Sequence, residues 1–171
     1  MQEINSSIPA TITTERLSLD LLTVNDHAFM RELMNTRGWL TFIGNRNIHS
    51  DEDAISYINK INGNPDFTYW TVRLKQHDKP IGVITFLKRI YLPHFDIGFA
   101  FLPEYFGQGY AFEAAGQVLS IVKRLPAHAT VLATTIPTNS SSIKLLTKLG
   151  FSFEKEIEEG DLKLHVYANV G

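Results

Sequence analysis

Two glycines separated by a single residue, Gly107 and Gly109, stand where an apolar segment gives way to one with helical periodicity. Glycine adopts positive φ without strain and lets a ligand approach the main chain closely. Several N–H groups at the N-terminus of a helix can then converge on one anion. The spacing predicts a phosphate-binding turn, with a tight turn that merely uses glycine as the alternative. Because Phe112 stands in place of the third glycine of G-x-G-x-x-G, a dinucleotide fingerprint is disfavoured.

The remaining pattern predicts the elements that position this turn. Alternating and apolar runs predict about seven strands, and helical periodicity with capping residues predicts about four helices. We expect strands at 16–22, 69–74, 81–87, 96–102, 130–136, 151–158 and 162–170, and helices from Asn25 or Asp26 to Arg37, from Ser50 to Gly63, over 109–124 and over 139–149. The strand–helix–strand–helix order over 96–149 implies one parallel crossover in a mixed, mostly antiparallel sheet. The expected fold is therefore a single α/β (α+β) domain, 14–171, after a flexible segment, 1–13.

The composition excludes several kinds of site. The 171 residues are 44% hydrophobic and 20% charged, which is typical of one ordinary globular domain. Cysteine is absent, which excludes disulfides, cysteine-ligated zinc, iron–sulfur clusters and a cysteine nucleophile. The net charge is −2 and not clustered, which argues against nucleic-acid binding. The six histidines fall on different elements, so no metal is expected. Without a signal peptide or an apolar span, we expect a cytoplasmic protein with no membrane partner.

Two segments resemble motifs of one enzyme family. The segment 96–115 resembles motif A of the GNAT superfamily of acetyl-CoA-dependent N-acetyltransferases, and 139–151 resembles that family's N-x-x-S…L-G-F helix. The aromatic Phe106 and the Thr-Glu-Arg-Leu opening at 14–17 resemble the RimJ/RimL-like branch, which acetylates protein N-terminal amines and has relatives acting on small amines. The resemblance runs from about Thr14 to Val170 and implies a GNAT-like fold with a splayed parallel central strand pair.

The resemblance also implies where acetyl-CoA would bind. Its diphosphate would rest on the main-chain N–H groups of Gly107, Gln108, Gly109, Tyr110 and Ala111. The pantetheine arm would pair with the backbone of Phe101 and Leu102, and Asn139 would hydrogen-bond it. Ser142 would face the thioester sulfur; the alternative is that Asn139 and Ser142 simply begin a helix. Gly98 suits either a bulge or close packing in its strand.

The catalytic groups are less clearly marked. Leu146 stands where many GNAT enzymes carry the tyrosine that protonates the leaving thiolate, so Ser142, directly or through water, is the expected acid. Asp96 is the expected base, and an exposed carboxylate at the strand end is the alternative reading. His94 and His49 are the other candidate bases. An α-amine, with a pKa of about 8, loses its proton more readily than a lysine, so a weak base suffices.

Together these features predict transfer of an acetyl group from acetyl-CoA to a primary amine, on a protein N-terminus or a small molecule. The transfer would be direct, in a ternary complex, because no cysteine can hold the acetyl group. Trp39, Tyr69 and His94 could line the acceptor cleft, although the two aromatic residues also suit the core. A non-catalytic acetyl-CoA sensor is the alternative, and a module that binds ATP at the glycine turn is a weaker one. We expect a monomer or a homodimer.

Overall fold

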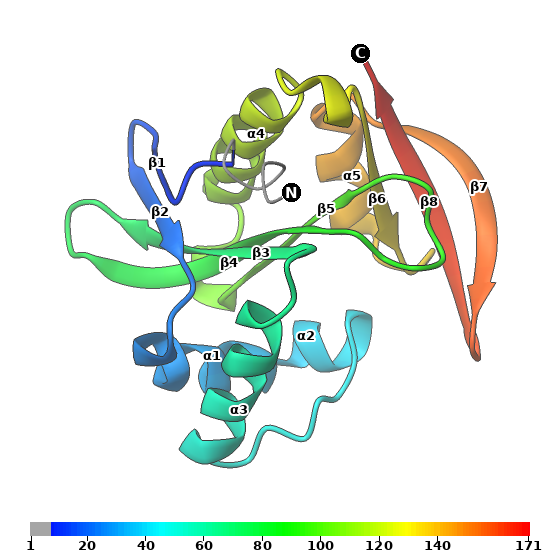
Figure 1. Ribbon diagram of the computed structural model, residues 1–171. Helices are drawn as coiled ribbons and strands as arrows, with labels where there is room; N and C mark the ends of the chain where they lie inside the picture. The colour runs from blue at the N-terminus through cyan, green and yellow to red at the C-terminus, as the bar shows by residue number, and fades with distance from the viewer. Residues whose placement is uncertain (1–7) are drawn as a thin grey trace.

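The computed structural model describes residues 8–171 and contains an eight-stranded sheet in the order β1-β2-β3-β4-β5-β6-β8-β7 (Figure 1). The strands are β1 (Thr11–Thr13), β2 (Leu17–Leu21), β3 (Phe67–Leu74), β4 (Lys79–Leu87), β5 (Asp96–Phe101), β6 (Thr130–Thr135), β7 (Ser152–Glu159) and β8 (Leu162–Val170). All neighbours are antiparallel except β5 and β6, which are parallel, so the expected mixed sheet with one crossover is confirmed. Of the segment expected to be flexible, 1–7 lies outside the described residues, whereas β1 pairs with β2.

The helices of the described chain cover both faces of the sheet. They are α1 (His27–Met34), α2 (Arg37–Phe42), α3 (Asp51–Asn62), α4 (Tyr110–Val122) and α5 (Ser140–Lys148). In Figure 1, α1 to α3 lie below the sheet and α4 and α5 above it. Each face has its own core: Trp70 and Phe86 belong to the cluster of α4, and Leu33 and Ile58 belong to that of α1 and α3. Within residues 8–171, no helix combines the length and the apolar character needed to cross a bilayer.

Strand β5 runs between these two cores. Ile97 and Phe101 pack into the core of α4, whereas Ala100 and Leu102 pack against that of α1 to α3. Consecutive side chains of a strand point to opposite faces, which explains this division. Any site formed along β5 is therefore supported from both sides of the sheet.

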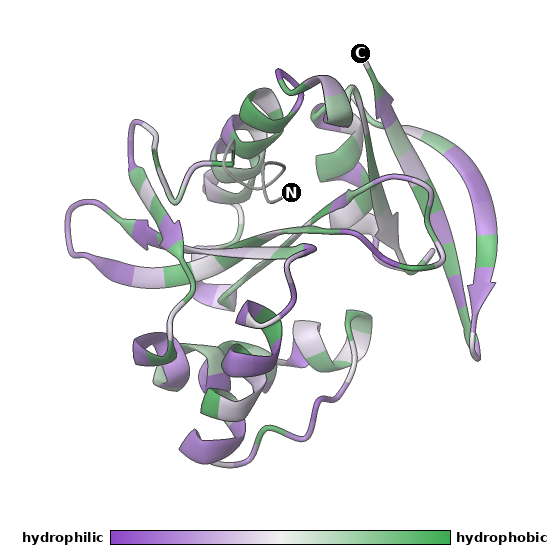
Figure 2. Cartoon of the chain, viewed as in Figure 1, coloured by the Kyte–Doolittle hydropathy of each residue, from purple (hydrophilic) through white to green (hydrophobic). Residues whose placement is uncertain are grey.

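The edge strand β7 has a different character from the central strands. Nearly all its residues are exposed, and Figure 2 shows it as mostly hydrophilic. Its glutamates, including Glu154, Glu156 and Glu158, place like charges along an open edge. Charge of this kind opposes pairing of an edge strand with another chain.

The first helical region differs from the sequence-based expectation of one helix from Asn25 or Asp26 to Arg37. Thr23 caps a short 3₁₀ turn over 24–26, and two separate helices, α1 and α2, follow. Asp26 does not cap α1 with its side chain, because that carboxylate is buried and accepts hydrogen bonds from the Thr71 hydroxyl, at 3.0 Å, and from Arg73. The expected cap is therefore wrong. A tertiary contact with β3 uses the group that local reasoning assigned to the helix.

His128 gives the fold a pH dependence that can be measured. Its ring lies edge-on to Phe86 and Phe95, with centroid separations of 5.0 and 4.8 Å. Burial lowers the pKa of His128 below its ordinary value. Between the lowered and the ordinary pKa the unfolded chain binds more protons, so stability is lost as pH falls below about 6.5. We expect His128→Phe to reduce the fall in Tm between about pH 7.5 and about pH 5. An equal fall in both proteins, measured by thermal denaturation, would contradict this.

Candidate active site

Strands β5 and β6 lie side by side at one end and separate toward the other. Their pairing consists of one position, Asp96 opposite Leu132, where the Leu132 N–H donates to the Phe95 carbonyl at 3.0 Å. Strand β4 instead pairs with β5 along its whole length. Beyond the shared end, Phe99 and Ala100 are only half-buried. The parallel central pair is therefore splayed, and β5 presents a free main-chain edge to the gap.

The hydrogen bonds around β5 show which residues form this free edge. Leu102 N–H donates to the Ile81 carbonyl of β4 at 2.9 Å, and the Leu102 carbonyl accepts from Tyr105 N–H at 3.0 Å. Because main-chain groups alternate between the two sides of a strand, Phe99 and Phe101 direct their N–H and C=O groups into the gap. The expected pairing of pantetheine with Phe101 is therefore possible. The main-chain groups of Leu102 are already used by Ile81 and Tyr105, so they are not free for the expected pairing, whereas those of Phe99 lie on the same edge as those of Phe101.

Gly98 is a packing glycine. The register between β4 and β5 is regular at Thr85 opposite Gly98, so the bulge considered for this position is absent. A Cβ atom at Gly98 would lie 2.6 Å from the Thr85 hydroxyl oxygen, closer than real contacts allow. The absence of a side chain lets the two strands stay paired beside the gap.

The glycine turn joins β5 to α4 at the open end of the gap. Phe106 is extended, while Gly107 and Gly109 have φ values of +72° and +82°. Both values lie in the left-handed region, which glycine enters without steric cost. Gly109 directly precedes α4 and has no side chain to cap it. The chain therefore reaches the N-terminus of a helix with its main chain uncovered.

The main-chain N–H groups of this turn are available to a ligand. Within residues 8–171, none of the five N–H groups from Gly107 to Ala111 has a hydrogen-bond acceptor. The first N–H groups of a helix lack intrahelical partners, and they carry its positive dipole end. The turn is exposed at Gly107, Gln108 and Gly109. An anion placed here would meet a set of unpaired donors in one short segment.

The N-terminus of α5 contributes two polar side chains. Asn139 caps this helix, its Oδ1 accepting from the Ser142 N–H at 3.2 Å. The capping interpretation is therefore confirmed, but it uses only the oxygen. The Asn139 amide nitrogen and the Ser142 hydroxyl have no hydrogen-bond partner within the described chain. Leu146, one turn further on, is 1% exposed and belongs to the core.

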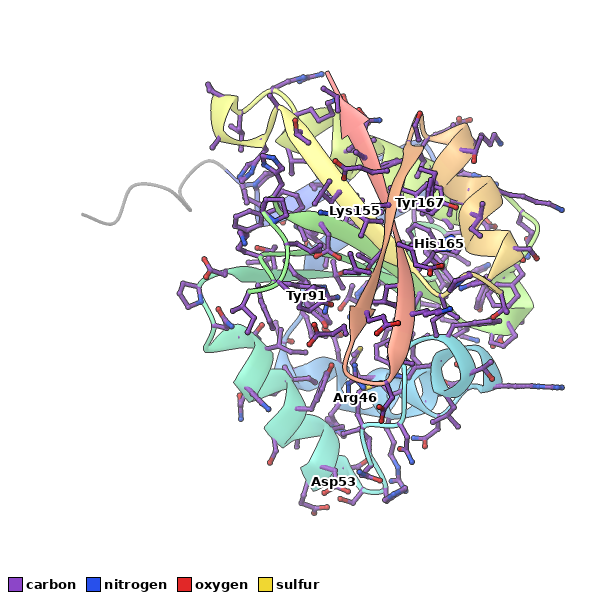
Figure 3. All side chains as sticks on the ribbon, turned by 90° about the vertical axis from the view of Figure 1, so that its right-hand side faces the viewer. Arg46, Asp53, Tyr91, Lys155, His165 and Tyr167 are labelled. Carbon is purple, nitrogen blue, oxygen red and sulfur yellow. The ribbon has the colours of Figure 1, made fainter. Side chains whose placement is uncertain are left out.

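Asp96 begins β5 where the two parallel strands meet. It is 3% exposed, so the interpretation as an exposed strand-end carboxylate is wrong. Arg89 Nε lies 3.2 Å from each of its carboxylate oxygens. Burial raises the pKa of Asp96, and Arg89 opposes this rise. Leu92, in the loop that carries Arg89, packs against β6 and β8. Its neighbour Tyr91, which is labelled in Figure 3, packs against the same cluster.

A family model described as an acetyltransferase (GNAT) domain matches residues 16–152, which include the splayed strands, the glycine turn and the start of β7. The chain belongs to the GNAT acetyltransferases. It is 30% identical over 155 residues, 88% of this chain and 89% of the relative, to the "Uncharacterized N-acetyltransferase YnaD" of Bacillus subtilis.

Solved structures agree with this assignment. An acetyltransferase (GNAT family) from Bacillus anthracis is 26% identical with a TM-score of 0.78, covering 94% of this chain and 98% of that one. The ribosomal L7/L12 alpha-N-protein acetyltransferase RimL, solved in complex with coenzyme A, has a TM-score of 0.80 at 14% identity, covering 95% and 97%. At that identity the likeness to RimL shows a shared fold.

The aromatic residues predicted for the acceptor cleft of this GNAT protein lie in the core. Trp39, on α2, and Tyr69, on β3, are 5% and 9% exposed and share a cluster with Leu102. Burial raises the pKa of Tyr69, and Tyr57 contributes to the rise. Trp39 Nε1 is buried without a hydrogen-bond acceptor in the described structure. Their structural role is clear, and a contact with the acceptor remains a prediction.

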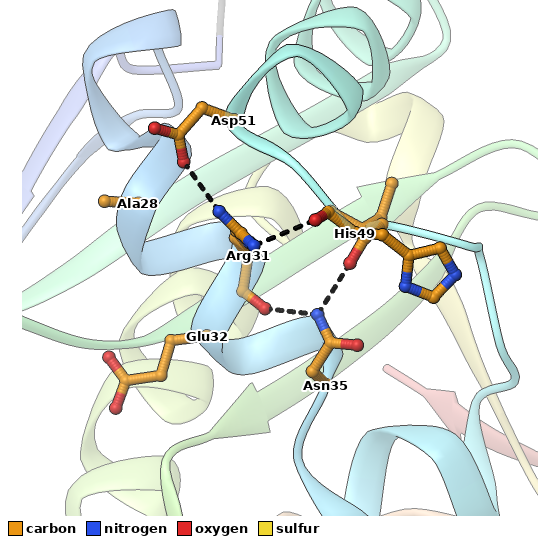
Figure 4. A pocket seen from close by; sticks show the side chains of 7 residues that line it. Ala28, Arg31, Glu32, Asn35, His49 and Asp51 are labelled. Atoms are coloured by element: carbon orange, nitrogen blue, oxygen red, sulfur yellow. Dashed lines mark hydrogen bonds and ion pairs between the residues drawn. The ribbon is translucent and has the colours of Figure 1, made fainter.

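The two candidate histidines lie on different loops. His94 is exposed in the loop before β5. His49 borders a pocket between α1 and α3, where Arg31 donates to the His49 carbonyl at 2.8 Å and Asn35 donates to the Ile48 carbonyl at 2.8 Å (Figure 4). These bonds tie the loop to α1. Across residues 8–171, no three His, Asp or Glu side chains are grouped to hold a metal ion.

Sequence analysis missed three residues at the site. Phe99 could have been found, because it lies two residues before Phe101 and shares its side of the strand. Arg89 contacts Asp96 across the loop that joins β4 to β5, and no local pattern marks it. Arg16 reaches the glycine turn from the start of the chain, and only the folded structure brings it there.

Proposed function

We propose that this GNAT protein transfers the acetyl group of acetyl-CoA to a primary amine, either a protein N-terminal α-amine or a small-molecule amine. The observation that carries the proposal is the set of N–H groups from Gly107 to Ala111 that have no acceptor in the described part of the chain and lie beside the free edge of β5. The diphosphate of coenzyme A matches the first feature. An extended amide chain such as pantetheine matches the second, by pairing with Phe99 and Phe101 as a strand would.

The same geometry supports the chemical step. The amine nitrogen attacks the thioester carbonyl carbon, the carbon–sulfur bond breaks, and the coenzyme leaves as a thiolate. A main-chain N–H of β5 aimed at the gap stabilises the developing oxyanion. Ser142, with its free hydroxyl, donates a proton to the thiolate directly or through water. Asp96 accepts the proton that the amine loses. Direct attack follows because the chain has no cysteine to carry the acetyl group.

The acceptor class rests on proton chemistry and on the relatives. A neutral amine is required, and an α-amine with a pKa of about 8 is about 10% neutral at pH 7, against less than about 0.1% for lysine. RimL, which shares the fold, is named as an alpha-N-protein acetyltransferase. An acceptor with an α-amine is therefore the first choice, and small amines with a similar pKa are the second.

The test is release of free thiol from acetyl-CoA with a panel of acceptors. The panel contains short peptides with free N-termini, the same peptides with blocked N-termini, free amino acids and small amines. Turnover with any free amine and none with its blocked partner supports the proposal. Binding of acetyl-CoA without turnover on any amine would instead favour a sensor, an alternative that gains weight because the hydrocarbon side chain of Leu146 has no proton to donate.

Ser142→Ala tests the proposed acid separately. The hydroxyl has no structural partner within residues 8–171, so the variant should fold with an unchanged Tm. We expect kcat to fall by about 10²-fold or more, since proton transfer by a positioned group contributes on that scale. The affinity for coenzyme A, measured by calorimetry, should change by less than about threefold, less than one hydrogen bond is worth. An unchanged kcat would assign the proton to water alone.

A further inference from the structure

The connection between β1 and β2 reaches the glycine turn through one side chain, that of Arg16. Its Nε lies 2.8 Å from Glu113 Oε1, and its Nη1 donates to the Gln108 carbonyl at 3.0 Å. The guanidinium carbon lies 4.4 Å from the centre of the Tyr110 ring. Arg16 therefore contacts the last residue before Gly109, the first residue of α4 and a carboxylate in the first turn of that helix.

The contact with Gln108 fixes the direction of a donor in the turn. The C=O and N–H groups of one trans peptide point in opposite directions. By binding the Gln108 carbonyl, Arg16 directs the N–H of Gly109 to the other side of the peptide plane. Gly109 has φ +82°, in a region where glycine rotates with little resistance. Without this contact, the peptide between Gln108 and Gly109 could turn and withdraw its N–H from the ligand.

The contact with Glu113 neutralises a negative charge close to the glycine turn. This carboxylate lies in the first turn of α4, where the diphosphate is proposed to bind, so a free negative charge would repel it. The Thr14 hydroxyl and the Arg16 N–H donate to Glu113 Oε2 at 2.5 and 3.0 Å, and Arg16 Nε pairs with Oε1. Although burial opposes it, these hydrogen bonds lower the pKa of Glu113, so it stays ionised. Arg16 supplies the compensating positive charge.

We propose that Arg16 is a positioning residue for the diphosphate of acetyl-CoA, holding the Gln108–Gly109 peptide in its donating orientation and neutralising Glu113. This inference rests on the proposed function. It predicts an effect on the diphosphate-bearing coenzyme and none on its pantetheine part, which lies along β5.

The test compares binding of coenzyme A with binding of pantetheine, which lacks the diphosphate and the nucleoside, by calorimetry. Arg16→Gln should weaken coenzyme A binding about 10-fold, the effect of losing one charge-assisted contact. Pantetheine binding should change less than about twofold, within the error of additivity for separate sites. Arg16→Lys should fall between, because an ammonium cannot serve Glu113 and Gln108 together as the guanidinium fork does. In turnover, KM for acetyl-CoA should rise while kcat at saturation stays near that of the native protein.

A matched control is Arg31→Gln. Arg31 is as exposed as Arg16, with 46% against 42% of its side chain accessible, and it pairs with Asp51 in the pocket of Figure 4. It should leave both affinities unchanged. Equal coenzyme A affinity in Arg16→Gln and the native protein would overturn the inference while leaving the proposed function standing. Equal losses for coenzyme A and pantetheine would also overturn it, because they would indicate general damage. Failure of the native protein to bind coenzyme A would instead refute the proposed function itself.

Discussion

Gly109→Val should abolish coenzyme A binding in a protein that still folds. Gly109 has φ +82°, and holding a residue with a side chain in this left-handed conformation destabilises the fold by about 1–2 kcal/mol, and by more when the side chain is β-branched. A Cβ atom would also lie 3.3 Å from Arg16 Nη2, so the guanidinium would have to move. If the turn relaxes to relieve this strain, its N–H groups no longer converge. Losing two hydrogen bonds to a charged diphosphate corresponds to about 3–6 kcal/mol, or a 10²- to 10⁴-fold loss of affinity.

The control must carry the same backbone strain elsewhere. Gly160 has φ +60° at the tip of the β7–β8 hairpin, and a Cβ atom added there would meet nothing within 4 Å. Gly160→Val should lower Tm to a similar extent and leave coenzyme A binding intact. Calorimetry with coenzyme A on both folded variants separates a local effect on the turn from general destabilisation. Native affinity in Gly109→Val would remove the diphosphate assignment.

The parts of the site that could be predicted from the sequence are local in the chain. The glycine turn, the start of α4 and the Asn139 cap each depend on residues within one turn of one another, so spacing and residue type were enough. The parallel crossover also followed, because the order of strands and helices allows few topologies. These features place the gap and the turn at its end.

The parts that could not be predicted depend on register and on long-range contacts. The hydrogen bond from Leu102 N–H to the Ile81 carbonyl of β4 decides whether the main-chain groups of Phe101 or those of Leu102 point into the gap. A shift of the β4–β5 register by one residue would reverse this. Arg16 meets Glu113 across 97 positions of sequence. The burial of Asp96 is decided only once Arg89 and the loop that carries it are placed.

The pair of Asp96 and Arg89 allows the proposed base to be tested by the direction of a pH effect. Asp96→Asn keeps the shape of the side chain and removes its proton acceptor. We expect kcat to fall by about 10²-fold or more, the contribution of a general base, while coenzyme A binding is unchanged because the glycine turn is intact. Burial raises the pKa of Asp96 and Arg89 restrains that rise. Arg89→Gln should therefore raise the pKa further and move the acid limb of the kcat profile to higher pH.

A double variant distinguishes catalysis by Asp96 from a purely structural role for its pair with Arg89. Removing one partner of a buried ion pair leaves an uncompensated charge and destabilises the fold, whereas removing both does not. In the double variant Asp96→Asn/Arg89→Gln, Tm should therefore recover relative to the single variants. If Asp96 is the base, kcat stays low in the double variant despite the recovered Tm. If kcat recovers together with Tm, or if Arg89→Gln leaves the acid limb in place, the carboxylate only holds Arg89 and the start of β5, and the amine loses its proton elsewhere.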